Sequence, residues 1–259
     1  ALRPYNDVGF VPTMGSIHQG HLSLIERSNR TCKKTIVSIF VNPKQFNNKK
    51  DFKNYPTNIK EDIKILKKTK KVDFLYIPKF KDVYNNNKKS NIKITKKNKI
   101  LCAKFRKGHF EGVLDVMERL TNLVNPKKIF MGKKDYQQYF LIKNYLKNKY
   151  KTSIIPCRTI RNKSKIALSS RNNHLDLNGI KKASFLSKSL IKLKRNLKNI
   201  KKIKQNLRIQ MKYFEKLLKI KIEYLELRSI KNLKISNTVR GSRLFVAYYI
   251  DNVRLIDNF

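Results

Sequence analysis

The sequence lacks the features that would place it in a membrane or an oxidising compartment. No apolar run in its 259 residues is long enough to span a bilayer, and no secretory signal is visible. It contains only three cysteines, Cys32, Cys102 and Cys157, with no C-x-x-C spacing. We therefore expect neither a disulfide framework nor a zinc site, and the chain fits the reducing cytoplasm.

Acidic residues are also scarce. There are 17 Asp and Glu against 61 Lys and Arg, which gives a formal net charge of +44 and a pI near 10.3. Such a balance favours a nucleic acid or a membrane surface as a first hypothesis. The lysines, however, are scattered from Lys33 to Lys234 among Asn and Ile, the residues of AT-rich codons, so mutational drift explains the charge equally well. We predict no membrane partner and no specific nucleic acid.

Strand-like and helix-like segments alternate over the first part of the chain. Apolar runs predict strands, and apolar residues at helical spacing between them predict helices. The predicted strands lie at 8–11, 36–41, 72–77, 129–131 and 153–155. This alternation predicts an α/β domain, residues 1–157, with a Rossmann-like doubly wound parallel sheet and helices on both faces. Ligands of such sheets bind at the carboxyl ends of the strands, where the strand order reverses.

The pattern changes after Cys157. A long Lys-rich helical region spans residues 181–219, and strand-like segments follow at 221–227 and 244–250. Residues 158–259 are therefore predicted to form a smaller C-terminal α+β domain. The polar segment 85–99 is predicted to be an exposed loop or a weak strand.

A glycine turn that carries two histidines follows the first predicted strand. If the next helix begins near His18, then His18 and His21 lie on one face of its first turn. Free backbone N–H groups and the positive end of the helix dipole favour a phosphate there. Histidines in a turn are more often surface or capping residues, so the hypothesis depends on the strand before the motif and the helix after it. We predict a cradle for the phosphates of ATP.

Other strand ends are polar in the same way. Asn42 and Gln45 follow the second predicted strand. The segment Gly132-Lys133-Lys134-Asp135 follows another strand and opens a helix that holds Gln137 and Gln138, and Arg158 and Arg161 precede residues 167–172. Each segment falls where a doubly wound sheet places a ligand.

Six motifs in order give the chain a family resemblance over nearly its whole length. They are Val11-Pro12-Thr13-Met14-Gly15 with His18 and Gly20-His21, Phe40-Val41-Asn42-Pro43 with Gln45-Phe46, Tyr55-Pro56, Gly108-His109-Phe110 with Gly112-Val113, Gly132 with Lys134-Asp135 and Gln137-Gln138, and Ala167-Leu168-Ser169-Ser170-Arg171-Asn172. In these motifs the chain resembles the pantothenate synthetase (pantoate–β-alanine ligase) family. That family has a fold like nucleotidylyltransferases and class I aminoacyl-tRNA synthetases, with a small C-terminal domain that we expect to act as a lid.

The resemblance implies a two-step reaction. ATP and (R)-pantoate would give pantoyl adenylate and diphosphate, and β-alanine would then displace AMP to give pantothenate. His21 would be the proton donor, and His18, Lys134 and Arg171 would share the catalytic work. Gln45 and Gln138 would contact the substrates, with Asn42 beside them. The ATP site would comprise Met14, Gly15, Ser16, Ile17, His18, Gln19, Gly20, His21, Gly132, Lys133, Lys134, Asp135, Ile160, Leu168, Ser169, Ser170 and Arg171.

The residue chemistry supports these roles independently. The first step develops negative charge on the α-phosphate and on the departing diphosphate, so donors must lie where that charge appears. Mg²⁺ would ordinarily bridge the phosphates through waters. The family's homodimer is expected as well.

The chain departs from the family pattern in several places. Lys133 stands where an acidic residue is usual, and Ser164-Lys165 stands where Asp-Gly is usual, which removes a flexible glycine from a loop that is expected to move. Residues 102–105 are also altered. The chain begins at Ala1, so we expect that a segment carried by the family before its first strand is missing.

Two alternatives belong to other classes. A nucleotidylyltransferase would share the histidine turn but would not explain Gln45, Gln138 and the Ser-Ser-Arg loop. A basic RNA-binding module would bind RNA tightly and in a salt-dependent way, yet the chain lacks the interleaved aromatic residues of a single-strand platform.

Overall fold

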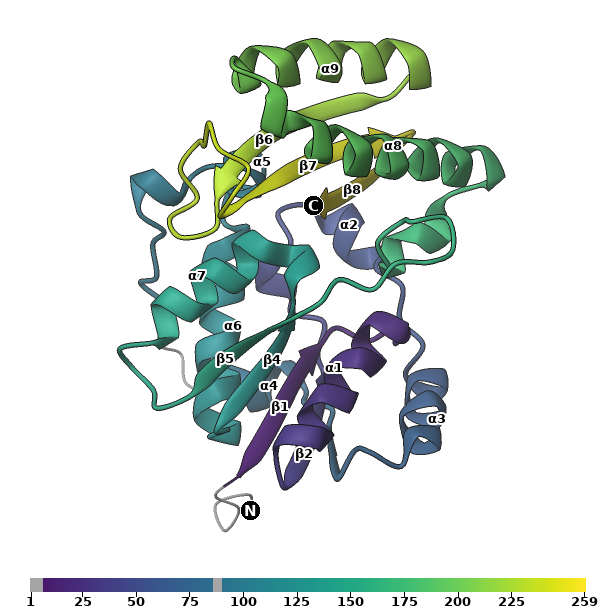
Figure 1. Cartoon of the computed structure of the whole chain (residues 1–259). Helices are drawn as coiled ribbons and strands as arrows, with labels where there is room; N and C mark the ends of the chain where they lie inside the picture. Colours follow the sequence, from purple (N-terminus) through teal and green to yellow (C-terminus); the bar gives the residue numbers. More distant parts are fainter. Residues whose placement is uncertain (1–6, 86–89) are drawn as a thin grey trace. The chain divides into compact units, whose positions relative to one another are not determined.

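The computed structural model describes residues 7–85 and 90–259 (Figure 1). The chain divides into two compact units, residues 1–159 and residues 160–259. The division lies two residues beyond the boundary expected from the sequence.

The first unit is built on a five-stranded parallel sheet. Its strands are β1 (Val8–Thr13), β2 (Lys34–Ile39), β3 (Phe74–Tyr76), β4 (Lys128–Gly132) and β5 (Ser153–Cys157), in the order β3-β2-β1-β4-β5. The predicted parallel sheet is confirmed. β3 is shorter than the predicted 72–77, since three of its residues pair with β2. Just before it, the backbone N–H of Asp73 donates to the carbonyl of Thr35, and the carboxylate of Asp73 accepts the N–H of Thr35.

Helices cover both faces of this sheet (Figure 1). The crossovers α1 (Gln19–Thr31) and α3 (Ile59–Thr69) lie on one face, and α6 (His109–Val124) and α7 (Tyr136–Leu146) lie on the other. The strands read as continuous apolar runs because both of their faces are buried. Short segments fill the connections: α2 (Lys49–Lys53), α4 (Phe80–Val83), α5 (Cys102–Phe105), η1 (Pro43–Gln45), η2 (Lys96–Asn98) and η3 (Lys133–Asp135).

The strand order fixes where a ligand can bind in the first unit. The chain runs outward from β1 through β2 to β3 and then returns to place β4 on the other side of β1. The carboxyl ends of β1 and β4 are therefore neighbours at the point of reversal, where parallel sheets bind their ligands. The histidine turn follows β1, and the Gly132–Asp135 segment follows β4.

The second unit has its own core. Helices α8 (Leu177–Asn196) and α9 (Ile203–Leu218) accompany an antiparallel sheet of β6 (Lys221–Ser229), β7 (Ser242–Ile250) and β8 (Val253–Asn258). The helical region 181–219 is thus two helices, separated by the turn η5 (Leu197–Asn199), whose Leu197 is fully buried. Sequence reasoning missed β8 because Asp257 and Asn258 are buried in it and interrupt the apolar pattern.

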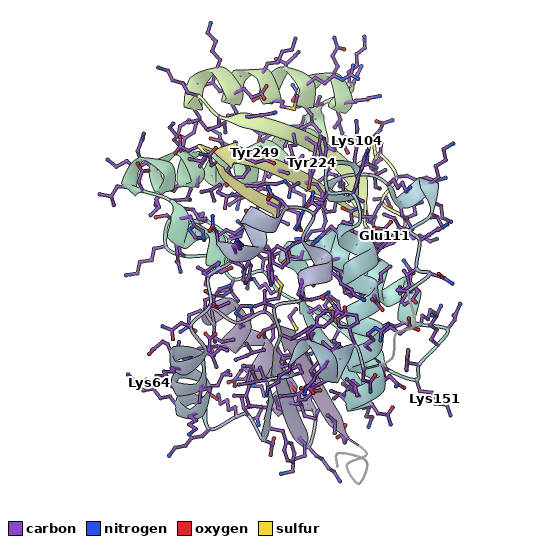
Figure 2. All side chains as sticks on the ribbon, turned by 180° about the vertical axis from the view of Figure 1, so that it is seen from behind. Lys64, Lys104, Glu111, Lys151, Tyr224 and Tyr249 are labelled. Atoms are coloured by element: carbon purple, nitrogen blue, oxygen red, sulfur yellow. The ribbon has the colours of Figure 1, made fainter. Side chains whose placement is uncertain are left out.

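Exposed lysines lie on separate parts of the first unit. Lys64, Lys104 and Lys151 are exposed and project outward in different directions (Figure 2). No helix in the described residues is both long and apolar enough to cross a membrane.

Candidate active site

A buried carboxylate fixes the turn that follows β1. Asp62 of α3, only 3% exposed, accepts the N–H of Ser16 at 2.9 Å and that of Ile17 at 2.7 Å. Gly15 has a φ of +81°, and a Cβ built on it would meet Oδ2 of Asp62 at 2.8 Å. Ser16 also adopts a left-handed φ of +52°. Glycine and the carboxylate together therefore set the path of the chain into α1.

Sequence reasoning missed Asp62, although a signal was present. Asp62 lies on the apolar stripe of α3 between Ile59 and Leu66. A carboxylate on such a stripe needs hydrogen-bond donors once it is buried. Here the donors come from the turn after β1.

His18 and His21 cap the helix that they open. His18 is the N-cap of α1, and its Nδ1 accepts the N–H of Gly20 at 3.0 Å. Nδ1 of His21 accepts the N–H of His18 at 3.4 Å. Since a neutral imidazole has one acceptor nitrogen, the proton of each ring then lies on Nε2. The two rings stack with their centroids 4.1 Å apart.

Both histidines are neutral at physiological pH. Burial lowers the pKa of His21 to about 3, and repulsion from His18, when that ring is protonated, and from Lys134 acts in the same direction. Burial and Lys134 also lower the pKa of His18. Each ring therefore acts as a hydrogen-bond donor through Nε2–H without carrying a charge.

The histidine turn differs from the expected cradle in one respect. The backbone N–H groups of Ser16, Ile17, His18 and Gly20 already have protein acceptors. The expectation of free amides is therefore wrong for these four residues, because Asp62 and the two imidazoles satisfy the orphan donors. The imidazole N–H groups remain as donors of this turn.

The segment after β4 supplies a positive charge beside the histidines. Lys134 lies in η3 with Nζ 3.5 Å from both carboxylate oxygens of Asp135. Its charge is close enough to lower the pKa of His18 and His21. Space is open beside Gly132, since a Cβ built there meets no atom within 4 Å. The structure thus brings together His18, His21 and Lys134 of the predicted site.

The loop after β2 holds Gln45 against the turn. Gln45 is buried, and its Nε2 donates to Sδ of Met14 at 2.8 Å. Asn42 is 1% exposed; its Nδ2 donates to the carbonyl of Gly112 at 3.1 Å, and its Oδ1 accepts from the hydroxyl of Tyr84 at 3.0 Å. Asn42 is therefore fitted to shape the loop around Gln45.

The adjacent glutamines of α7 lie in different environments. Gln137 is buried, and its Nε2 donates to the carbonyl of Ile100 at 2.7 Å. Gln138 is half-buried, and its amide has no hydrogen-bond partner within the described residues. Gln138 is therefore the more accessible of the two to a ligand.

His109 and Gly112 of α6 pack against the loop that contains Gln45. Nδ1 of His109 lies 2.7 Å from the carbonyl of Gln45, and its Nε2 lies 2.9 Å from Nη1 of Arg106. A Cβ on Gly112 would lie 2.2 Å from the carbonyl oxygen of Lys44. The Gly108-His109-Phe110 motif therefore acts through tertiary contacts that sequence reasoning did not foresee.

A cavity of about 250 Å³ opens beside the turn at the carboxyl ends of β1, β2 and β3. Its lining is mostly apolar and includes Met14, Gly15, Val41, Pro43, Asp62 and Phe80. Its size suits a small organic molecule.

In the second unit, residues 160–171 form a closed hairpin and a short turn. The N–H of Leu168 donates to the carbonyl of Ile160 at 3.0 Å, and Ser169 caps the turn η4 (Ser170–His174) by accepting the N–H of Arg171 at 3.3 Å. Lys165, which replaces the glycine usual in the resembled family, adopts a φ of +68°. The backbone conformation at position 165 is thus left-handed, which glycine adopts more easily than lysine.

Sequence relatives share nearly the whole chain. A family model described as pantoate-beta-alanine ligase matches residues 2–259. The pantothenate synthetase of Pseudothermotoga lettingae is 36% identical over 264 residues, covering 99% of this chain and 92% of that protein. That of Leptospira interrogans serovar Lai is 40% identical over 259 residues, covering 97% of this chain and 89% of that protein.

Solved structures of the same kind are also similar. The pantoate-beta-alanine ligase of Francisella tularensis, complexed with beta-gamma ATP and beta-alanine, gives a TM-score of 0.84 at 37% identity. The match covers 100% of this chain and 91% of that one. A pantothenate synthetase structure from Thermus thermophilus gives a TM-score of 0.88 at 31% identity and covers 99% of this chain and 94% of that one.

Proposed function

This chain belongs to the pantoate-beta-alanine ligase family of ATP-dependent, amide-forming ligases. We propose that its candidate site catalyses the reaction in two steps. In the first, a carboxylate oxygen of (R)-pantoate attacks the α-phosphorus of ATP, and the bond to diphosphate breaks. In the second, the amine of β-alanine attacks the acyl carbon of pantoyl adenylate, loses a proton, and displaces AMP to give pantothenate.

The observation that carries this proposal is the pair of neutral histidines beside Lys134. Charge develops on the phosphate oxygens as the α-phosphorus is attacked, and fixed donors there stabilise the transition state. His18 and His21 offer two Nε2–H groups from stacked rings, and Lys134 adds the positive charge. Because its pKa is about 3, the His21 ring is neutral, and we propose that it gives the phosphates a hydrogen bond through Nε2–H.

The amides of Gln45 and Gln138 are proposed to bind pantoate. Each side chain offers a donor and an acceptor, which suits the hydroxyl and carboxylate groups of this substrate. Gln45 is held by Met14 and by the loop that Asn42 shapes, whereas Gln138 is without a partner in the described part of the chain. β-Alanine is proposed to approach Gln45 as well.

The remaining ATP contacts are assigned by resemblance. On the first unit they fall on Met14–His21 and Gly132–Asp135, and on the second unit on Ile160 and Leu168–Arg171. We propose that the second unit acts as a lid that excludes water from the adenylate. Equal rates of adenylate hydrolysis in the full chain and in a variant whose hairpin 160–171 is replaced by a glycine-rich loop would contradict this role.

Mg²⁺ is proposed to enter as part of the Mg-ATP substrate. No three His, Cys, Asp or Glu side chains in residues 7–85 and 90–259 cluster in a way that could hold a metal ion. Bridging of the phosphates through waters is compatible with this arrangement. We also propose a homodimer and a cytoplasmic location, and sedimentation velocity of the purified chain tests the first.

The decisive experiment measures AMP released from Mg-ATP in the presence of pantoate and β-alanine. His21→Ala should reduce the rate by orders of magnitude, because it removes a donor to the transition state; removal of one such donor costs about 10²–10³ in kcat. Near-normal activity of this variant would refute the role of His21. ATP–diphosphate exchange that depends on pantoate supports the two-step route, and exchange only with a phosphorylated acceptor such as phosphopantetheine would contradict it.

A further inference from the structure

A buried ion pair joins the hairpin of the second unit to the last strand of the chain. Nη1 and Nη2 of Arg161 donate to Oδ2 and Oδ1 of Asp257 at 2.6 and 2.8 Å. The Asp257 side chain is 4% exposed, and that of Arg161 is 19% exposed. A two-pronged contact of this kind fixes the orientation of the guanidinium plane as well as its distance.

The remaining contacts of Arg161 all stay within the second unit. Nη1 also donates to the carbonyl of Lys165 at 2.9 Å, and Nη2 donates to the carbonyl of Asn258 at 3.3 Å. The guanidinium lies 4.6 Å from the ring centre of Phe259. Both terminal nitrogens are thus engaged by protein acceptors, so Arg161 is built to hold the chain rather than to contact a phosphate.

The hairpin that Arg161 holds leads directly into residues 168–171. Arg161 forms an antiparallel bridge with Ala167, and Nδ2 of Asn172 donates to the carbonyl of Ala167 at 3.0 Å. The turn of the hairpin contains Lys165 in a left-handed conformation, which is unfavourable for a residue with a side chain. Such a hairpin depends on contacts outside itself to keep its shape.

We propose that Asp257 and Arg161 are positioning residues for the ATP-contacting segment Leu168–Arg171. The inference rests on the proposed role of that segment in binding ATP. The carboxylate of Asp257 orients the guanidinium, the guanidinium holds the carbonyl of Lys165, and the closed hairpin presents Ser169 and Arg171 in one arrangement. The end of the chain thereby sets the geometry of half of the nucleotide site without touching the nucleotide.

The test replaces Asp257 with Asn, which turns an NH₂ group toward a guanidinium that has only donors. KM for ATP should rise about tenfold, which corresponds to ~1.4 kcal/mol of binding, while KM for pantoate stays within about twofold. Amide hydrogen exchange of residues 160–172 should become faster in the same variant. Arg161→Lys is the second variant, for use if Asp257→Asn folds poorly. It keeps the positive charge but loses the two-pronged contact, so the KM for ATP should rise by an intermediate factor.

The matched control is the ion pair between Arg254 and Glu223, which joins β8 and β6 at 2.6 Å and is buried to a similar extent. Glu223→Gln should cost comparable stability and leave KM for ATP and the exchange of residues 160–172 unchanged. The inference is overturned if Asp257→Asn leaves KM for ATP unchanged, or if Glu223→Gln raises it equally.

Arg171→Ala separates this inference from the proposed function. If Arg171→Ala raises KM for ATP and Asp257→Asn does not, only the positioning role fails. If Arg171→Ala has no effect on KM for ATP, the assignment of the segment fails and the inference fails with it.

Discussion

Lowering the pH should destabilise this protein through His21. The unfolded imidazole has a pKa near 6.5, and in the folded state burial and the neighbouring positive charges lower the pKa to about 3. Between these values the unfolded chain binds the proton and the folded protein does not, so the free energy of unfolding falls as the pH falls from 6.5 toward 3. pH 5 lies about 1.5 units below the unfolded pKa, and each unit lowers the free energy of unfolding by ~1.36 kcal/mol, so the loss at pH 5 is ~2 kcal/mol.

The assay is urea denaturation at pH 7.5 and pH 5, for the natural chain and for His21→Asn. Asn keeps an acceptor for the N–H of His18 but does not titrate, so groups elsewhere in the protein contribute equally to both proteins. The natural chain should lose ~2 kcal/mol more than the variant over this interval. Equal losses in the two proteins would refute the conclusion that His21 is held neutral by its surroundings.

Four further substitutions, of which Gly132→Ala is a control, test the roles assigned to individual residues of the two units. Gly112→Ala should cost ~1–3 kcal/mol and raise KM for pantoate, because its Cβ would meet the carbonyl of Lys44 at 2.2 Å, whereas Gly132→Ala should leave the stability unchanged; urea midpoints compare them. Asp62→Asn should cost ~1–3 kcal/mol and lower kcat by leaving one buried backbone N–H of the turn without an acceptor, and an unchanged kcat would contradict its role. Lys165→Gly should stabilise the protein by ~1 kcal/mol because φ is +68° there, and a lower Tm would count against strain at this residue.

Much of the fold could be predicted because the sheet of the first unit is buried on both faces. Its strands are short apolar runs, and Asn125 and Pro126 mark the end of α6 in the sequence as they do in the structure. β8 escaped prediction for the opposite reason. Asp257 and Asn258 are buried there only because Arg161 and Arg243 supply donors, and the sequence contains no sign of that pairing.

The candidate site divides in the same way. The two histidines could be predicted because the strand, the turn and the helix that position them are consecutive in the chain. Asp62 and His109 act on residues more than forty positions away, so no local pattern could connect Asp62 with Ser16 or His109 with Gln45.

The stacked histidines can work only while both are neutral. Two positive charges about 4 Å apart repel by ~4 kcal/mol at an effective dielectric constant of 20, and the ring centres of His18 and His21 are 4.1 Å apart. Protonation of either ring would also remove the acceptor that its Nδ1 offers to a backbone N–H, and so would open the cap of α1. In a chain with a net charge of +44, the site therefore leaves the positive charge to Lys134 and uses the imidazoles as uncharged donors. It follows that an acid limb of kcat/KM near pH 6, which reports the groups of the free enzyme, is expected to come from groups other than His21.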